Sequence, residues 1–360
     1  MPTIADFIDE LDSIAPPGLA DTDDRIGLQV GDRSREAKRV CVSVDTSDAI
    51  VDLAIERKAD LLVAHHPLIY TPLTSLAADD PVARRLTKLV RANTAVFVLH
   101  TNYDTAPGGI NDTLAGKLGV LDCEPLTARK SDPFVKIAVF VPEEAVEDVR
   151  NAMAEAGAGM IGQYTHCSFR TPGIGSFVPL PAAQPYVGKV GKLEEVEEYR
   201  LEMVCAASWA GNVIAAMLET HPYDEVAYDV YELANEPARY GYGRVGTLDE
   251  EVSVREFAQR VRTTLEPEHV GIWGDLDKRV KRVAVCGGGG SSLFKEAVKA
   301  GAHVYVTGDT KHHDRLDAGA LGLAVIDAGH FETEKPGMVA LAERLTKTFA
   351  GSGAQIEYIE

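Results

Sequence analysis

Six apolar runs, three in the first third of the chain and three in the last, constrain the fold more than any other feature. Each run ends in a polar cluster, and patterns typical of helices separate neighbouring runs. A continuous apolar run suits a strand buried on both faces, and alternation with helices indicates a parallel α/β sheet. The runs are RVCVSVDTS (39–47), ADLLVAHHP (59–67), TAVFVLHTNYD (94–104), RVAVCGGGG (282–290), AHVYVTGD (302–309) and LAVIDAGHFETE (323–334).

The first and last thirds of the chain also share a spacing. Arg39 precedes Asp60 by 21 residues in the first third. Arg282 precedes His303 by the same interval in the last third, which aligns DLLVAHH with HVYVTGD. A fixed interval between similar segments is a sign of an internal repeat. We therefore expect an α/β core made of two similar halves.

Residues 133–233 have a different pattern and interrupt the two halves. A strand pattern (VKIAVFVP) and a helix pattern (EEAVEDVRNAMAEAG) precede a stretch rich in Gly, Pro and Ser at 171–191. A strand (EYRLEMVCAAS), a helix (AGNVIAAMLETH) and a strand (EVAYDVYEL) follow. This β-α-β, β-α-β order is typical of a ferredoxin-like α+β fold and indicates an inserted domain. The predicted domains are 1–127 for the first half, 128–245 for the insert and 246–360 for the second half.

The composition disfavours several partners and locations. The formal net charge of −19 argues against nucleic acid or an anionic membrane as partner, because like charges repel. The N-terminus has no basic stretch before an apolar run, and no window reaches about eighteen uninterrupted apolar residues, so we expect neither a signal peptide nor a membrane span. The five cysteines include no CxxC pair. Reduced thiols in a cytoplasmic protein fit this usage better than disulfides.

Histidines and carboxylates follow the ends of the predicted strands. The carboxyl ends of parallel strands lie at one edge of a sheet, where open α/β folds bind ligands. Imidazole and carboxylate donors suit zinc, iron or manganese, and there are too many here for one tetrahedral ion. The candidates are His65, His66, His100, Asp104, His330 and Glu334.

The spacing of these candidates favours a pair of metal ions. Neighbouring strand residues point to opposite faces, so we expect His65 and His66 to address different metals or different sides of a pair. His330 and Glu334 are four apart and would share one helix face. A carboxylate such as Glu334 can bridge two cations, whereas a neutral imidazole offers one lone pair. The competing reading is a hydrogen-bonded core histidine or a solvated carboxylate, and His100 is expected beside the ligands rather than among them.

Two further motifs leave alternatives open. The CGGGGSS loop (286–292) lies between a strand and a helix, so its amides could cradle an anion, or it could be only a tight turn. It lacks the Lys-Ser/Thr of a phosphate-binding loop. His312 and His313 follow the next strand and are candidates either for substrate contact and proton transfer or for a surface role.

Several of these motifs, in this order, resemble the Nif-three-like (YbgI-like) family of type 2 GTP cyclohydrolase I homologues. The resemblance covers about residues 1–127 and 246–360. One departure is Arg25, where the family tends to have Asn. The motifs are IGLQVGD (26–32), AHHPLIY (64–70), HTNYDTAPGGINDTLAGKLG (100–119), AVCGGGGSS (284–292), VYVTGDTKHHD (304–314) and DAGHFETE (327–334).

The resemblance implies a fold, an assembly and a set of ligands. The fold would be two Nif-three-like α/β halves facing a dinuclear site in a toroidal homohexamer, with a CutA/PII-like insert as in the longer family members. Two divalent ions, zinc, iron or manganese, would bind each chain, with Glu334 as the bridge. His313 would be preferred over His312 for proton transfer. The implied metal ligands are His65, His66, Asp104, His330 and Glu334.

Our leading functional hypothesis is a metal-dependent hydrolase of the cyclohydrolase type. Water acidified by the metals would attack C8 of a purine nucleotide, a small-molecule substrate, and His313 would protonate the departing nitrogen. Glu334 and His313 are the catalytic candidates. The alternative is a metal-binding scaffold, metallochaperone or regulatory protein whose insert senses a ligand or partner without hydrolase activity. Hydrolysis of another phosphoester or cyclic amide is a third reading.

Overall fold

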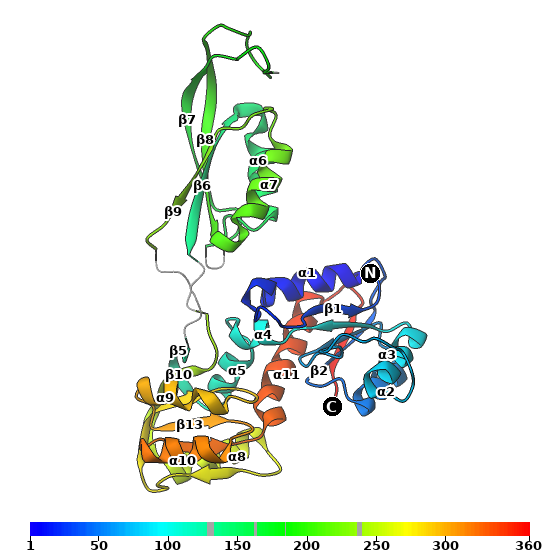
Figure 1. Cartoon of the computed structure of the whole chain (residues 1–360), viewed down its shortest axis with the longest axis vertical. Coiled ribbons are helices and arrows are strands. Elements are labelled where there is room, and N and C mark those ends of the chain that lie inside the picture. The colour runs from blue at the N-terminus through cyan, green and yellow to red at the C-terminus, as the bar shows by residue number, and fades with distance from the viewer. Residues whose placement is uncertain (128–132, 162–163, 184, 236–239) are drawn as a thin grey trace. The chain divides into compact units, whose positions relative to one another are not determined.

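The computed structural model describes residues 1–127, 133–161, 164–183, 185–235 and 240–360. The chain is mixed α/β and divides into two compact units. Residues 1–129 and 239–360 form one, the core unit, and residues 130–238 form the other, the inserted unit. In Figure 1 the inserted unit is the green part of the chain.

The first sheet of the core unit has five strands in the order β1-β4-β3-β2-β15. The predicted runs of the first third form β2 to β4, and their side chains are almost all buried. β15, β2, β3 and β4 are parallel, whereas β1 pairs antiparallel with β4. The strands are β1 (Gly27–Val30), β2 (Arg39–Ser43), β3 (Leu61–Ala64), β4 (Ala95–Val98) and β15 (Gln355–Tyr358).

The second sheet of the core unit has six strands in the order β11-β14-β13-β12-β10-β5. The predicted runs of the last third form its parallel centre, β12 to β14. β10 crosses the predicted boundary between residues 245 and 246, so the last two residues assigned to the insert lie in a core strand. The strands are β5 (Val120–Pro125), β10 (Arg244–Ser253), β11 (Gly271–Trp273), β12 (Arg279–Val285), β13 (Val304–Thr307) and β14 (Ala324–Asp327).

The two sheets exchange elements between the sequence halves. β5 comes from the first half yet pairs with β10 in the second sheet, and β15 comes from the second half yet pairs with β2 in the first. Helix α11 (His330–Thr348) follows β14 and packs against β2, β15 and α5 (Ile110–Lys117). Figure 1 shows α11 between the two sheets. Its buried Met338, Leu341 and Leu345 share a hydrophobic cluster with the first sheet.

Four of the other core helices begin where the sequence supplies capping side chains. Thr3 and Ser253 form capping boxes at α1 and α8, and Ser47 and Asp80 cap α2 and α3, because these oxygens accept bonds from unpaired first-turn amides. The core helices besides α5 and α11 include α1 (Ile4–Ile14), α2 (Asp48–Glu56), α3 (Pro81–Ala92), α4 (Thr101–Thr105), α8 (Val254–Leu265), α9 (Phe294–Lys299) and α10 (His312–Ala320).

The inserted unit has the predicted β-α-β-β-α-β order. Its antiparallel sheet, in the order β7-β8-β6-β9, packs one face against α6 and α7. β7 is an edge strand and lies largely in the Gly/Pro/Ser-rich stretch. An edge strand tolerates Pro172, which has no N–H group, because one side of the strand has no neighbouring strand to bond. The narrower CutA/PII-like assignment stays a prediction. The elements are β6 (Phe134–Pro142), α6 (Val146–Glu155), β7 (Ser168–Phe177), β8 (Glu194–Ala206), α7 (Ala210–Thr220) and β9 (Tyr228–Glu232).

Within the part of the chain that the structure describes, no helix combines the length and the apolar character needed to cross a membrane.

Arg244 provides a test of how the core unit is held together. Its guanidinium is 4% exposed, pairs with Asp112 of α5 and donates to the carbonyls of Gly241 and Gly243 at 2.9 and 2.8 Å. Removing the guanidinium leaves the buried Gly241 carbonyl without this donor and takes a charged partner from Asp112. We expect Arg244→Met to lower the free energy of unfolding by about 2–4 kcal/mol, measured by urea unfolding.

The matched control is Arg255→Met, because Arg255 is 62% exposed and pairs with Asp277 at the surface. We expect a loss below about 1 kcal/mol for this variant. Equal losses for the two variants would contradict the role assigned to Arg244.

Candidate metal centre

The candidate residues come from three strand ends. His65 and His66 directly follow β3, and Asp104 lies in α4, just after β4. His330 and Glu334 lie in the first turns of α11, just after β14 of the second sheet. Because α11 packs on the first sheet, the structure brings all five residues together.

The Glu334 carboxylate contacts three imidazoles. Its Oε1 lies 3.1 Å from His330 Nε2 and 3.5 Å from His65 Nε2, and its Oε2 lies 3.2 Å from His66 Nε2. Glu334 is only 3% exposed. Asp104 Oδ1 lies 3.6 Å from the same Nε2 atom of His65. Glu334 thus contacts three imidazoles at once, and its role as a bridge between two ions stays a prediction.

Each imidazole of the cluster is held by its Nδ1 atom. A carbonyl or carboxylate oxygen can only accept, so each Nδ1 carries the hydrogen and each neutral ring keeps its lone pair on Nε2. Metal-binding histidines in proteins are oriented in this way. The pairs are His65 with the Leu99 carbonyl (2.9 Å), His66 with Asp45 (2.7 Å), His100 with Asp24 (2.8 Å) and His330 with Asp309 (2.7 Å).

The facing lone pairs need a cation or protons between them. His66 Nε2 and His330 Nε2 are 3.2 Å apart. Among the described residues, His65 Nε2, Asp104 Oδ1 and Glu334 Oε2 are buried without a hydrogen-bond partner. Buried polar atoms of this kind are costly unless something satisfies them. The donors fit a divalent metal, since nitrogen and carboxylate oxygen are the ligands that zinc, iron and manganese accept.

Without a cation, protons occupy the cluster. Burial lowers the pKa of His66, but bonding to the carboxylates of Asp45 and Glu334 outweighs it and raises that pKa to about 10. Hydrogen bonding to Glu334 raises the pKa of His330 to about 9. Burial raises the pKa of Asp104 to about 7. Protons therefore compete with any metal ion for the imidazole lone pairs.

His100 lies closer to the donors than we expected from the sequence. One of its ring nitrogens is within 4.8 Å of ring nitrogens of His65 and His66, so these three could hold an ion together. His66, His330 and Glu334 form a second such group. Burial is the main cause that lowers the pKa of His100, which favours the neutral ring that metals bind.

Three carboxylates that orient the imidazoles were missed from the sequence. Asp45 and Asp309 follow β2 and β13, and they orient His66 and His330. Their place after strand ends was the available signal. Asp24 gave no such signal, because it precedes β1 and reaches His100 from 76 residues away. Arg25, the departure from the family pattern, is exposed, and its backbone amide donates to Asp24 at 2.7 Å.

His313 lies apart from this cluster. It is exposed in the first turn of α10, and the ring beside it is that of His312, at 5.5 Å between centroids. The described contacts of the five clustered residues do not include it. Its catalytic role stays a prediction.

The glycine-rich loop after β12 supports the cluster from one side. The amides of three glycines donate to side chains, so they are not free to cradle an anion. A Cβ at Gly288 would lie 2.2 Å from Glu334 Oε1, so only glycine lets this backbone approach the carboxylate. The bonds join Gly287 to Asn111 (2.9 Å), Gly288 to Thr333 (2.9 Å) and Gly290 to Thr307 (3.0 Å).

Comparison with known proteins places the whole chain in one family. The sequence pattern of Duf34/NIF3 (NGG1p interacting factor 3) matches residues 2–360. The chain belongs to the Duf34/NIF3 family. The resemblance inferred from the motifs is thereby confirmed. The same fold underlies a solved structure described as a Bacillus cereus protein related to NIF3, with a TM-score of 0.83, 38% identity, and coverage of 99% of this chain and 96% of that chain.

Several relatives share one name. A GTP cyclohydrolase 1 type 2 homolog of Bacillus subtilis is 45% identical over 325 residues, which cover 90% of this Duf34/NIF3 chain and 87% of that protein. A protein of the same name from Mycobacterium tuberculosis is 39% identical over 357 residues, which cover 97% of this chain and 93% of that protein. The similarity therefore extends through the inserted unit.

Substitution of Gly288 tests whether the loop positions Glu334. Gly288 has a φ of +66°, so a side chain adds backbone strain to the clash with the carboxylate. We expect Gly288→Ala to lower metal bound per chain to below about half, since a supporting group is worth about 10–100-fold in metal affinity. Elemental analysis after dialysis against limiting Mn²⁺ measures this.

Gly319→Ala is the control, because Gly319 lies in α10 with nothing within 4 Å of an added Cβ. It should leave the metal content unchanged. If Gly288→Ala binds as much metal as the Gly319 variant, the loop does not position Glu334.

The raised pKa values of His66 and His330 give metal binding a defined pH dependence. Because their pKa values are about 10 and 9 in the metal-free cluster, metal binding at neutral pH must release protons. We expect the apparent Mn²⁺ affinity to fall about tenfold per pH unit for each proton released as the pH drops from 8 to 6. Calorimetric titration in buffers of different ionisation enthalpy counts these protons.

The exposed His313 supplies a control for this measurement, since His313→Ala should leave the pH dependence unchanged. A Mn²⁺ affinity that is constant between pH 6 and 8 would contradict the assignment of these imidazoles as ligands.

Proposed function

We propose that this chain is a hydrolase that depends on two divalent metal ions and acts on a purine nucleotide. The observation that carries the proposal is the convergence of four imidazole rings with the carboxylates of Asp104 and Glu334. His65, His66, Asp104, His330 and Glu334 would hold the ions, with His100 as a further donor.

The charges of the cluster favour two ions over one. Five carboxylates, those of Asp24, Asp45, Asp104, Asp309 and Glu334, contact four imidazoles that are neutral when they bind metal. Two divalent cations would balance four of the five negative charges. The two donor groups, one around His65 and His100 and the other around His330 and Glu334, share His66 and would each serve one ion.

The chain's residues set up the centre for hydrolysis. Bound divalent ions would act as Lewis acids and lower the pKa of a water molecule, which makes it a nucleophile at neutral pH. Asp45 and Asp309 would keep the His66 and His330 rings in place, and Glu334 would connect the two ion positions. The name GTP cyclohydrolase 1 type 2 homolog, given to the relatives, supports attack at C8 of a purine ring with release of formate.

Replacement of Glu334 tests the hydrolase proposal. Glu334→Gln keeps the size of the side chain but removes the charge that contacts three imidazoles. We expect formate release from GTP by Mn²⁺-loaded protein to fall at least about tenfold, with the metal content reduced. The control is Glu332→Gln, which alters a carboxylate of the same helix outside the cluster and should change the rate less than about twofold.

Two results would reject the proposal in different ways. Protein that retains two metals per chain but releases no formate from GTP would reject the cyclohydrolase activity. Fewer than one metal per chain, with all four histidines intact, would reject the dinuclear centre itself.

A second candidate, a metal-binding scaffold or regulatory protein, is favoured by the surface of the inserted unit. Large exposed apolar side chains are concentrated there, and exposed patches of this kind mark interaction sites. Under this reading, Phe169→Ser with Ile174→Ser removes partner binding without changing the metal content. Prominent examples are Tyr164 (73% exposed), Phe169 (68%), Ile174 (70%) and Leu180 (71%).

A further inference from the structure

The opposite edge of the five-stranded sheet carries a basic groove. It lies where β2, β3 and β4 begin, whereas the metal centre lies where they end. Arg35, Arg39 and Lys58 line it with a single carboxylate, Asp60, so the lining has a formal charge of +2. This is a local reversal of sign in a chain whose net charge is −19.

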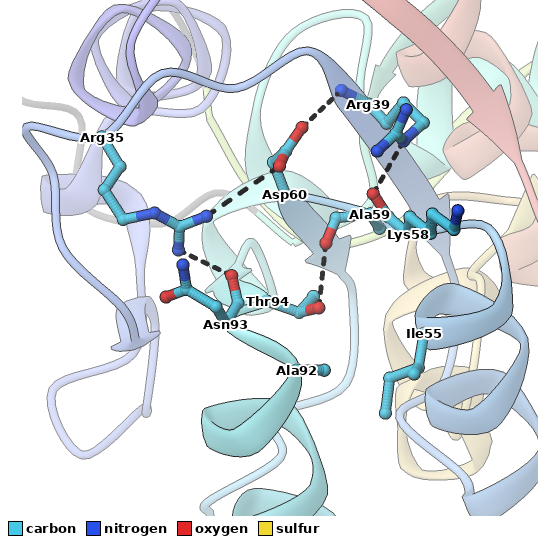
Figure 2. Close-up of a pocket in the computed structure, with 9 residues that line it drawn as sticks. All are labelled: Arg35, Arg39, Ile55, Lys58, Ala59, Asp60, Ala92, Asn93 and Thr94. Atoms are coloured by element: carbon cyan, nitrogen blue, oxygen red, sulfur yellow. Dashed lines mark hydrogen bonds and ion pairs between the residues drawn. The ribbon is translucent and has the colours of Figure 1, made fainter.

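Backbone carbonyls hold both guanidinium groups of the groove in place. Arg39 donates from Nε to the Lys58 carbonyl at 2.8 Å, and Arg35 donates from Nη1 to the Asn93 carbonyl at 2.6 Å. Figure 2 shows these two arginines on either side of Asp60. Among the described residues, the terminal nitrogens of Arg39 have no hydrogen-bond partner. Two fixed guanidinium groups with free donors are the arrangement that binds phosphate oxygens.

Asp60 offsets only part of the positive charge and leaves most of the arginine donors unoccupied. Its Oδ2 accepts from the backbone amides of Lys38 and Arg39, both at 2.9 Å. Its Oδ1 lies 3.9 Å from Arg35 Nη2, which is too long for the hydrogen bond of a close ion pair. The carboxylate therefore serves the backbone at the start of β2 and leaves the donors of Arg35 and Arg39 available.

The groove is larger than one phosphate group. Its volume is about 350 Å³, and Ile55, Ala59 and Ala92 add apolar lining to the charged groups. A pocket of this size that combines charged groups with some apolar lining suits a small organic anion. At about 3.3 Å per strand residue, β2 and β3 separate the groove from the metal centre by about 13–16 Å, so a phosphate bound here does not reach the metal ligands.

We propose that this groove binds a small phosphorylated molecule, with Arg35 and Arg39 holding its phosphate group. The site is separate from the metal centre and does not depend on the proposed hydrolase activity. The shared chemistry of its ligands is a phosphate or pyrophosphate group on a body small enough for the groove.

The test is calorimetric titration of the full chain with pyrophosphate at fixed ionic strength, before and after removal of metals with a chelator. Chelation excludes pyrophosphate bound through metal ions. We expect saturable binding of one pyrophosphate per chain, and Arg39→Ala should weaken it at least about tenfold, the usual effect of losing a hydrogen bond to a charged group. The affinity of Arg39→Lys should lie between those of the unchanged protein and Arg39→Ala, because lysine keeps the charge but lacks the paired N–H donors of the guanidinium group.

Two control variants test whether pyrophosphate binds in the groove itself. Arg255→Ala removes the same charge from the exposed surface of α8 and should change the affinity less than about twofold. Glu334→Gln alters the metal centre and should leave pyrophosphate binding unchanged. Thermal unfolding checks that each variant is folded. If Arg39→Ala does not fold, Lys58→Gln replaces it as the test variant, because it removes a charge from the groove and keeps the Arg39 bond to the backbone. Lys58→Gln should also weaken pyrophosphate binding.

The proposal is overturned by any of three results. These are the absence of saturable binding, equal weakening by Arg39→Ala and Arg255→Ala, and loss of binding in Glu334→Gln. Nucleoside monophosphates and inorganic phosphate, titrated in the same way, distinguish an organic phosphate from the free anion. If a short oligonucleotide binds more tightly than pyrophosphate, and Arg39→Ala weakens that binding, the ligand of the groove is a nucleic acid and not a small molecule.

Discussion

Helix α11 is the element on which the core unit and its metal centre both depend. It leaves the six-stranded sheet after β14, buries Met338, Leu341 and Leu345 against the five-stranded sheet and leads to β15 in that sheet. Its first two turns therefore hold His330 and Glu334 at the end of β3. Burial of an apolar helix face, worth about 25 cal/mol per Å², thus fixes a polar centre that neither sheet could assemble alone.

The centre concentrates groups that would repel one another if neither protons nor a cation lay between them. Nε2 lone pairs face each other and face carboxylates inside a buried space, where electrostatic interactions are strong. The surrounding structure nevertheless holds them in place, through Asp45 and Asp309 on the imidazoles and Gly288 against Glu334. The scaffold thereby holds nitrogen and carboxylate donors close together in an arrangement that fits a cation.

The sequence predicted most of the fold and brought out the clustered residues, for identifiable physical reasons. Parallel strands end at one edge, so His65, His66, Asp104, His330 and Glu334 could be grouped from their positions after apolar runs. Side-chain pairing across long sequence distances could not be read in this way, and Asp24, Asp45 and Asp309 were missed. The exchange of β5 and β15 between sheets was also not predictable, because local pattern does not specify which sheet an edge strand joins.

The pairing of β15 with β2 has a consequence for synthesis of the chain. β2 is made early, but the strand that covers its edge and the helix that carries Glu334 emerge only after residue 330. A nascent chain therefore presents His65 and His66 long before it has the carboxylate that connects them, and its five-stranded sheet keeps an open edge until then. A metal ion that needs Glu334 as a ligand could therefore be captured only late, by a core unit whose two sheets are already joined.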